Sequence, residues 1–301
     1  MIVGSTGGQR SDRKVILAYE DEARGSSAVS VRVFDAARAL SEHRPVAIRP
    51  LSALGSVSGR TILVVKPKDY WSLGPVLGRG NRVLVDVLDG TGSLEAADRS
   101  LLAEVDGGLF CSLSALSEYG PLFKGGRHGM STTIYHPWDE RMRALREGMP
   151  RSGGLRVGYF GYPGKGYLVP GLPGVDMVPI VAHSDMSDPR RLFGEHSAHY
   201  VIKPESRRHL YEPLTKVVVA AAAGCPVLAL RGSAEAAELL GPGYPYLSDS
   251  RSEEDVLHTL ELMRDTYGCS EWSHALSVME AVRSATDPSV SAGRLHEWLC
   301  R

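Results

Sequence analysis

The sequence predicts an α/β protein made of two Rossmann-like domains that face one cleft. Short apolar runs alternate with amphipathic segments along the whole chain, which is typical of parallel sheets covered by helices. Residues 147–154 interrupt this alternation and combine Pro150, Gly153 and Gly154 with charged side chains, as an exposed hinge does. The length of 301 residues is enough for two domains with separate cores. We therefore expect an N-terminal domain over residues 1–148 and a C-terminal domain over residues 149–301.

Composition and charge exclude several classes of protein. Hydrophobic residues make up 43% of the chain and charged residues 23%, as in soluble globular proteins. A net charge of -1 gives no reason to expect nucleic acid or an acidic membrane as partner. We find no signal peptide and no apolar run near the roughly 20 residues that span a bilayer. The four cysteines lack CxxC spacing, which favours reduced thiols in a cytoplasmic protein over a disulfide framework or a zinc site.

The N-terminal half is expected to begin with a strand, a small-residue loop and a helix. Residues 14–19 are a clean apolar run, and residues 31–42 place Val31, Phe34, Ala37 and Leu40 on one helical face. Further strands are expected at residues 45–51, 60–68, 82–90 and 108–113, with helices at residues 93–105 and 114–123. This half lacks a GxGxxG motif, so we do not expect a dinucleotide site in it.

Carboxylates lie at the expected carboxyl ends of two of these strands, where doubly wound sheets place their chemistry. Glu20 and Asp21 follow the first strand, and Asp86 and Asp89 end the fourth. The alternative for each is structural: a solvated loop carboxylate, or an aspartate that caps a neighbouring loop.

The C-terminal half repeats the pattern. A strand at residues 155–161 leads into Gly161, Gly164 and Gly166 around Lys165, and glycines after a strand let backbone amides approach phosphate. A simple chain-reversing turn is the alternative. A strand is expected at residues 175–183, a short helical segment at residues 188–196, and three helices at residues 252–268, 271–285 and 290–301.

Residues 199–241 are the most informative stretch. An apolar run at residues 199–204, a basic loop, a helix that starts at Pro213 and ends at Gly224, and a strand at residues 227–230 make one βαβ unit. A helix N-terminus carries unpaired N–H groups and partial positive charge, so it attracts phosphate. Thr215 adds a hydroxyl and Lys216 a full charge. An ordinary capped helix remains the alternative.

This stretch resembles the donor domain of GT-B glycosyltransferases. The elements that carry the resemblance are Pro213, Lys216, Ala222, Gly224, Pro226, Val227 and Glu238. The resemblance implies that the region holds the diphosphate of a nucleotide sugar. Many retaining members carry one Glu that binds the nucleotide ribose and another near the sugar; here those positions are Val219 and Tyr211, with Glu212 one residue away. It also implies that His136, Pro137 and Asp139 mark the passage out of the first domain, and that the last helix crosses back onto it.

We therefore expect a glycosyltransferase that moves a sugar from a nucleoside-diphosphate sugar to an acceptor the sequence does not identify. Helix amides and cations would stabilise the leaving diphosphate, so the reaction calls for no metal and no cofactor. The expected donor-binding residues are Gly161, Gly164, Lys165, Glu212, Pro213, Leu214, Thr215, Lys216, Arg231 and Glu238. The candidates for catalysis are Asp21, Asp89 and His136.

Two other functions stay open at this point. A nucleotide-sugar epimerase can share the architecture and would act without an acceptor. A non-catalytic partner of another transferase is favoured by Val219 and Tyr211.

Overall fold

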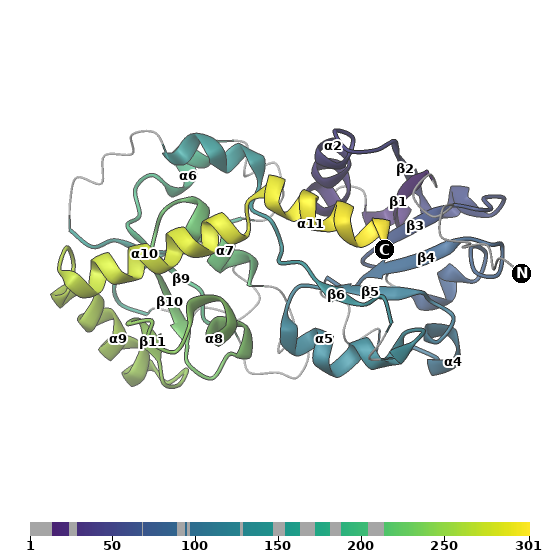
Figure 1. Ribbon diagram of the computed structural model, residues 1–301. Helices are drawn as coiled ribbons and strands as arrows, with labels where there is room; N and C mark the ends of the chain where they lie inside the picture. The colour runs from purple at the N-terminus through teal and green to yellow at the C-terminus, as the bar shows by residue number, and fades with distance from the viewer. Residues whose placement is uncertain are drawn as a thin grey trace, which may run out of the picture. The chain divides into compact units, whose positions relative to one another are not determined.

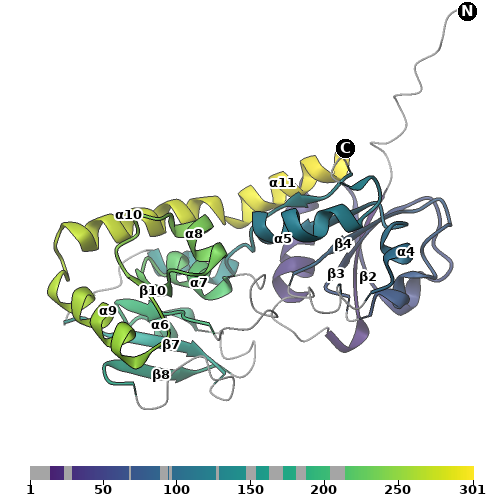
Figure 2. The ribbon, with the colours of Figure 1, turned by 90° about the horizontal axis from the view of Figure 1, so that it is seen from below.

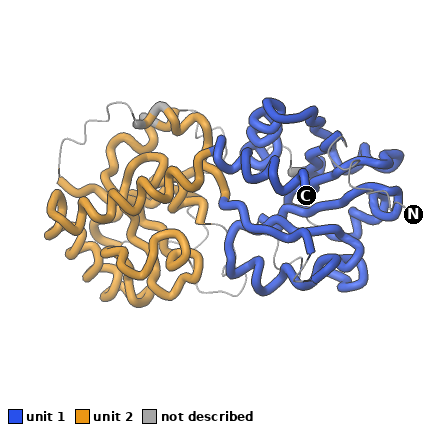
Figure 3. The backbone as a smooth tube through the Cα atoms, viewed as in Figure 1, with its two compact units in different colours: residues 1–135, 288–301 blue, residues 136–287 orange. Residues whose placement is uncertain are grey.

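The computed structural model describes residues 14–23, 29–67, 69–88, 94, 97–126, 129–146, 154–162, 172–180, 188–203 and 214–301. The chain divides into two compact units, residues 1–135 with 288–301 and residues 136–287 (Figure 3). The boundary expected at residue 148 falls inside the second of these ranges, which also contains the 3-10 segment Glu140–Arg146. Residues 288–301 belong to the first unit.

The first unit is a parallel sheet of six strands in the order β2-β1-β3-β4-β5-β6 (Figure 1). The strands are β1 Val15–Tyr19, β2 Val46–Pro50, β3 Thr61–Val65, β4 Arg82–Asp86, β5 Gly107–Phe110 and β6 Thr132–Thr133. The helices are α2 Ala36–Leu40, α4 Arg99–Leu102, α5 Leu113–Tyr119 and α11 Pro288–Cys300. Short 3-10 segments are Asp21–Ala23, Leu51–Leu54, Tyr70–Leu73 and Gly120–Leu122.

The helix expected at residues 31–42 begins as a π-helical segment, Ser30–Asp35, and continues as α2. Val31, Ala37 and Leu40 are buried as the periodicity predicts, but Arg32 is buried as well. The wider π turn brings this arginine inward, where it pairs with Asp86. Hydrophobic periodicity alone does not predict a buried cation.

The second unit is a parallel sheet of five strands in the order β11-β10-β9-β7-β8 (Figure 2). The strands are β7 Val157–Gly161, β8 Val175–Pro179, β9 Ala198–Tyr200, β10 Val227–Leu230 and β11 Leu247–Ser248. The helices are α6 Pro189–Phe193, α7 Thr215–Ala222, α8 Ala234–Leu240, α9 Glu253–Asp265 and α10 Ser270–Ala285. Each sheet thus places its second strand on one side of the first and its third on the other, which is a doubly wound order. Among the described residues, no helix is both long and apolar enough to cross a bilayer.

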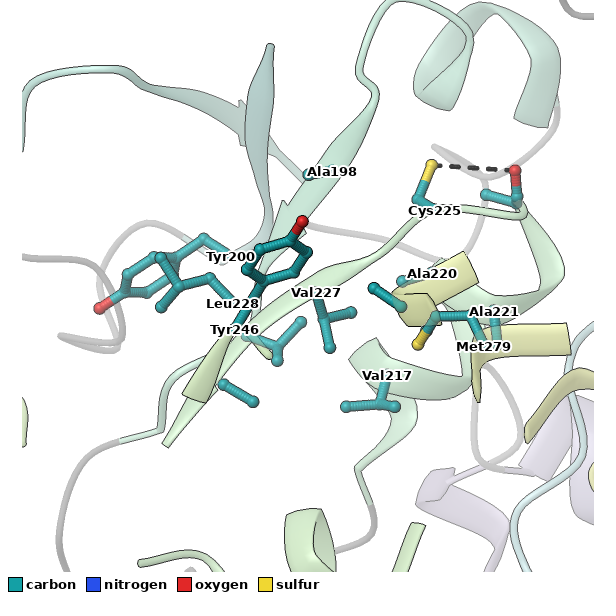
Figure 4. Close-up of a cluster of buried hydrophobic side chains, with 14 of the residues drawn as sticks. Ala198, Tyr200, Val217, Ala220, Ala221, Cys225, Val227, Leu228, Tyr246 and Met279 are labelled. Carbon is teal, nitrogen blue, oxygen red and sulfur yellow. Dashed lines mark hydrogen bonds between the residues drawn. The ribbon is translucent and has the colours of Figure 1, made fainter. Parts of the chain in front are cut away.

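Helix α7 is fixed in place by small and branched apolar side chains. Val217, Ala220 and Ala221 gather with Met279 of α10 beside Val227 of β10 (Figure 4). Gly224 ends the turn after the helix with a φ of 65°, a left-handed conformation that glycine adopts without strain, as the sequence predicts. The small alanines bring the helix close to the sheet, and the N-terminal turn of α7 is held at the carboxyl edge of the strands.

Candidate functional site

The candidate site lies where the strand order of the second sheet reverses, between β7 and β9. In open parallel sheets, ligands bind outside the carboxyl ends of the strands at this point. Gly161 ends β7, and Tyr200 and Val201 lie at the end of β9. Helix α7 follows β9 along the chain, and its first residues, Thr215 and Lys216, line a pocket at the same edge.

The pocket has a volume of about 370 Å³, part of it open to solvent. Its lining comes from three strands or strand ends and two helices: Phe160, Ile180, Phe193, His199, Tyr200, Val201, Thr215, Lys216 and Val219. The lining is mostly apolar, and its polar side chains are His199 and Tyr200 of β9 and Thr215 and Lys216 at the start of α7.

Lys216 reaches across the end of β7. Its Nζ lies 3.6 Å from the centroid of the Tyr159 ring, a cation-π contact. A Cβ atom on Gly161 would lie 2.5 Å from this Nζ and 3.0 Å from the Tyr159 hydroxyl oxygen. Only a glycine at position 161 therefore lets the ammonium approach the strand end in this way. The contact joins two residues that the sequence predicts for one site but places 55 positions apart.

The first turn of α7 also has a partial positive charge from its backbone N–H groups. Leu214 precedes the helix with a φ of -74° and a ψ of 55°, and its apolar side chain makes no capping hydrogen bond. The leading N–H groups of a helix have no partner within the helix, and they favour an anion. With the Thr215 hydroxyl and the Lys216 ammonium, the arrangement can hold a phosphate or diphosphate.

Aromatic rings form the floor of the pocket. The ring centroids of Phe160 and His199 are 4.4 Å apart, and those of Phe193 and His199 are 5.5 Å apart with stacked planes. On Tyr200, burial raises the pKa of the phenol to about 12, so its hydroxyl stays protonated at neutral pH. The sequence pattern does not mark these residues as a site. Phe160, His199 and Tyr200 lie in apolar strands and Phe193 ends a short helix, and such apolar segments predict burial and not a ligand.

Other predicted donor-binding residues lie apart from this contact or outside the described residues. Arg231, at the end of β10, pairs with Asp249 at 2.5 Å and donates to the backbone oxygen of Leu247 at 3.3 Å. Glu238 is half-buried on α8, while Glu235, one turn earlier, is buried with its carboxylate 3.9 Å from Lys203. Gly164, Lys165, Glu212 and Pro213 lie outside the described residues.

The candidates for catalysis come from different places. Asp21 begins an exposed 3-10 turn after β1 in the first unit. His136, the first residue of the second unit, is 9% exposed, and its Nδ1 lies 2.7 Å from the backbone oxygen of Pro137. Asp89 lies outside the described residues. The catalytic roles of these residues stay predictions.

The carboxyl edge of the first sheet holds a buried ion pair. Arg32 donates to both carboxylate oxygens of Asp86, at 2.7 and 2.9 Å. Burial opposes the charge on the guanidinium, but Asp86 outweighs it and raises the pKa of Arg32. Nearby, burial and then the Asp86 charge raise the pKa of Tyr70, whose hydroxyl has no hydrogen-bond partner among the described residues. Asp86 thus has a structural partner, but that partner is the Arg32 guanidinium and not the neighbouring loop that the sequence analysis gave as the structural alternative.

Comparison with solved structures identifies the fold. The Anabaena protein HepE, in complex with UDP, matches with a TM-score of 0.61 at 13% identity over 94% of this chain and 98% of that one. Sucrose-phosphate synthase from Thermosynechococcus elongatus matches with a TM-score of 0.60 at 10% identity, over 95% and 98% of the two chains. The α,α-trehalose-phosphate synthase (UDP-forming) from Burkholderia xenovorans matches with a TM-score of 0.59 at 10% identity, over 95% and 100%.

No protein-family model and no curated protein sequence matches this chain. These three solved structures are GT-B glycosyltransferases, and this chain has the GT-B fold. The fold class predicted from the sequence is therefore confirmed. At these identities the likeness is one of fold.

Proposed function

We propose that this chain is a glycosyltransferase that takes a sugar from a nucleoside-diphosphate sugar and transfers it to an acceptor without a metal ion. The observation that carries the proposal is that Thr215 and Lys216 line one pocket at the reversal of the strand order, with the Lys216 ammonium close to Gly161. The GT-B fold supports it, as do the solved structures of HepE with UDP and with UDP-glucose. Residues 1–148 would bind the acceptor and residues 149–301 the donor.

The chemistry follows from where charge develops. As the bond between the sugar and the diphosphate breaks, the sugar becomes oxocarbenium-like and negative charge gathers on the leaving phosphate oxygens. The Lys216 ammonium, the Thr215 hydroxyl and the N–H groups of the first turn of α7 would stabilise that charge. These groups are already held in place by the packing of α7, so they need no reorganisation during the reaction.

The proposal predicts that Lys216→Ala removes nucleotide binding. The Tm of the full chain is measured with each of a panel of nucleoside diphosphates and nucleoside-diphosphate sugars. A ligand at 100 times its Kd raises the free energy of unfolding by about 2.7 kcal/mol, so binding raises the Tm. We expect one nucleotide to raise Tm of the wild type and no nucleotide to raise Tm of Lys216→Ala. The Tm without ligand should change little, because Lys216 is half-buried and its ammonium lies over the Tyr159 ring. In turnover, loss of one stabilising group should lower kcat by about 10²- to 10³-fold.

Lys124→Ala is the matched control, because Lys124 is an exposed lysine of the first unit that pairs with Asp106. It should respond to nucleotides as the wild type does. A Lys216→Ala chain that still responds would show that Lys216 is wrongly assigned. A wild-type chain that responds to no nucleotide would overturn the proposed function.

A non-catalytic partner of another transferase is a second candidate, favoured by the apolar Val219 in the pocket wall. A turnover assay distinguishes the two functions. A nucleotide sugar that binds but is neither hydrolysed nor transferred to any acceptor would support the non-catalytic partner.

A further inference from the structure

The ring of Tyr159 has a fixed place in the second sheet. Tyr159 belongs to β7, which pairs with β8 on one side and β9 on the other, and it is 1% exposed. Its hydroxyl donates to the backbone oxygen of Tyr162 at 3.3 Å. Its ring meets the Tyr200 ring edge-on, with the centroids 6.2 Å apart. Strand pairing, a hydrogen bond and a second ring therefore hold the Tyr159 ring in position.

Lys216 brings a flexible side chain to this fixed ring. Its ammonium lies 3.6 Å from the ring centroid of Tyr159, and the same lysine lines the pocket. The face of an aromatic ring attracts a cation but carries no net charge, so it does not repel an incoming phosphate as a carboxylate would. An ammonium that rests on a ring face also keeps N–H groups that can donate to an anion. The contact thus holds the cation in place and leaves it able to bind phosphate.

We propose that Tyr159 is a positioning residue of the site: its ring holds the Lys216 ammonium at the pocket before a nucleoside diphosphate binds. This inference rests on the proposed function. Tyr159 acts through Lys216 and not by contact with the nucleotide. Ordering a long side chain during binding lowers affinity, by about three- to tenfold for a side chain as flexible as lysine. Because the ring orders Lys216 in advance, the nucleotide meets a cation that is already in place.

Variants at position 159 test this role through the Kd of UDP, dTDP, ADP, GDP and CDP. Tyr159→Leu removes the ring, and the Kd of the nucleotide that binds should rise about three- to tenfold. Tyr159→Phe keeps the ring and should recover most of the wild-type affinity. Tyr244→Leu is the matched control, because Tyr244 is 2% exposed in the same core and bonds to Val227 at the start of β10, away from the carboxyl ends of the strands. It should lower Tm and change Kd by less than about twofold.

NMR of the full chain follows the Lys216 side chain itself. Lysine is labelled with ¹³C at Cε, and the Lys216 signal is the one that is missing from Lys216→Ala. The face of an aromatic ring shields nearby protons, so the Lys216 Hε signal should lie upfield of the signals of the other lysines. It should stay upfield when the nucleotide binds, because the ring and the phosphate hold the ammonium together. This measurement needs no variant at position 159, so it decides the inference if Tyr159→Leu does not fold.

Three results would overturn the inference and leave the proposed function intact. The first is a folded Tyr159→Leu chain whose Kd lies within about twofold of the wild-type value. The second is a Tyr159→Phe chain that binds as weakly as Tyr159→Leu. The third is a Lys216 signal that is not upfield in the free chain, or that loses its upfield position on binding, since the ring would then compete with the nucleotide. If the wild type binds none of the nucleotides, the inference and the proposed function both fail.

Discussion

Two buried polar residues, one in each unit, show how single side chains constrain this fold. Arg32 is 5% exposed and Asp86 1% exposed, and their two hydrogen bonds tie the π-helical segment to the end of β4. His196 is 5% exposed, and its Nε2 lies 3.1 Å from Asp176 of β8. Both side chains are buried and polar, so the stability of the fold depends on their keeping their hydrogen-bond partners.

Loss of Arg32 should be strongly destabilising, because it leaves the Asp86 carboxylate buried without its partner. We expect Arg32→Met to lower the free energy of unfolding by about 3–5 kcal/mol in urea denaturation. The double variant Arg32→Met/Asp86→Leu should recover most of that loss, since an apolar pair carries no buried charge. Arg38→Ala breaks an exposed pair with Asp35 and should change stability by less than about 1 kcal/mol. If Arg32→Met also changed the free energy of unfolding by less than about 1 kcal/mol, the buried pair would not be important for stability.

His196 should make stability depend on pH. Burial lowers the pKa of its imidazole, and this effect outweighs the hydrogen bond that the imidazole donates to Asp176, which raises the pKa. The charge of Arg156 also lowers the pKa, and the charges of Asp176 and Glu195 raise it. Because the folded pKa lies below the unfolded value of about 6.5, the unfolded chain binds the proton first as pH falls. Stability from this residue is therefore present above about pH 6.5 and is lost as pH falls below it. His196→Gln should flatten the slope of unfolding free energy between pH 7.5 and 5.5, whereas His258→Gln, at an exposed position of α9, should keep it. Equal slopes in wild type and His196→Gln would refute this.

Helix α7 and strand β7 show how elements create a site that neither contains alone. The alanines and valines of α7 fix the helix against β10 and α10, and this packing sets where its first turn ends up. The strand contributes Gly161, whose missing side chain leaves room for the Lys216 ammonium. The helix start and the strand end form one site because β7 and β9 are neighbours in the sheet.

Gly161→Ala should therefore impair binding more than folding. The new Cβ would lie 2.5 Å from Nζ of Lys216, and the flexible lysine side chain would move away to relieve the clash. We expect the Kd for the nucleotide to rise about tenfold, the equivalent of losing about 1.4 kcal/mol of the charged contact. Gly154→Ala is the control, because a Cβ at Gly154 meets nothing within 4 Å. If the two variants bound the nucleotide equally well, the Gly161 contact would have no role in binding.

At the scale of the whole molecule, the C-terminal residues 288–301 belong to the unit that the first half of the chain forms. Helix α11 packs along α2 and supplies Leu295, Trp298 and Leu299 to the core of the first unit (Figure 1). Arg82 of β4 donates to the backbone oxygens of Leu299 and Trp298, and the Trp298 indole N–H donates to the backbone oxygen of Met130. The first unit is thus completed by the last residues of the sequence.

Trp298→Ala should destabilise the first unit and spare the second. Removing this buried ring should cost about 3–5 kcal/mol, because the cavity it leaves adds to the lost burial. Native-state hydrogen exchange resolves the two units: protection of β1 and β3 should fall, and that of β7 and β9 should not. Trp71→Ala removes a tryptophan that is 63% exposed, and it should leave the hydrogen-exchange protection of both units unchanged. Unaltered protection of β1 and β3 in Trp298→Ala would mean that α11 contributes little to the first unit.

The sequence by itself determined the elements and the class of fold. Apolar runs at residues 14–19, 155–161 and 227–230 became strands, and Gly224 ended α7, because these features depend on local periodicity and backbone preference. Only the tertiary structure decided that Lys216 lies over Tyr159, that Arg32 faces Asp86, and that Val219 stands in a pocket wall with Ile180. Those contacts join residues far apart along the chain, and they depend on which strands become neighbours in the sheet. The order of the strands in each sheet depends on how the whole unit packs, so it cannot be predicted from a local sequence pattern.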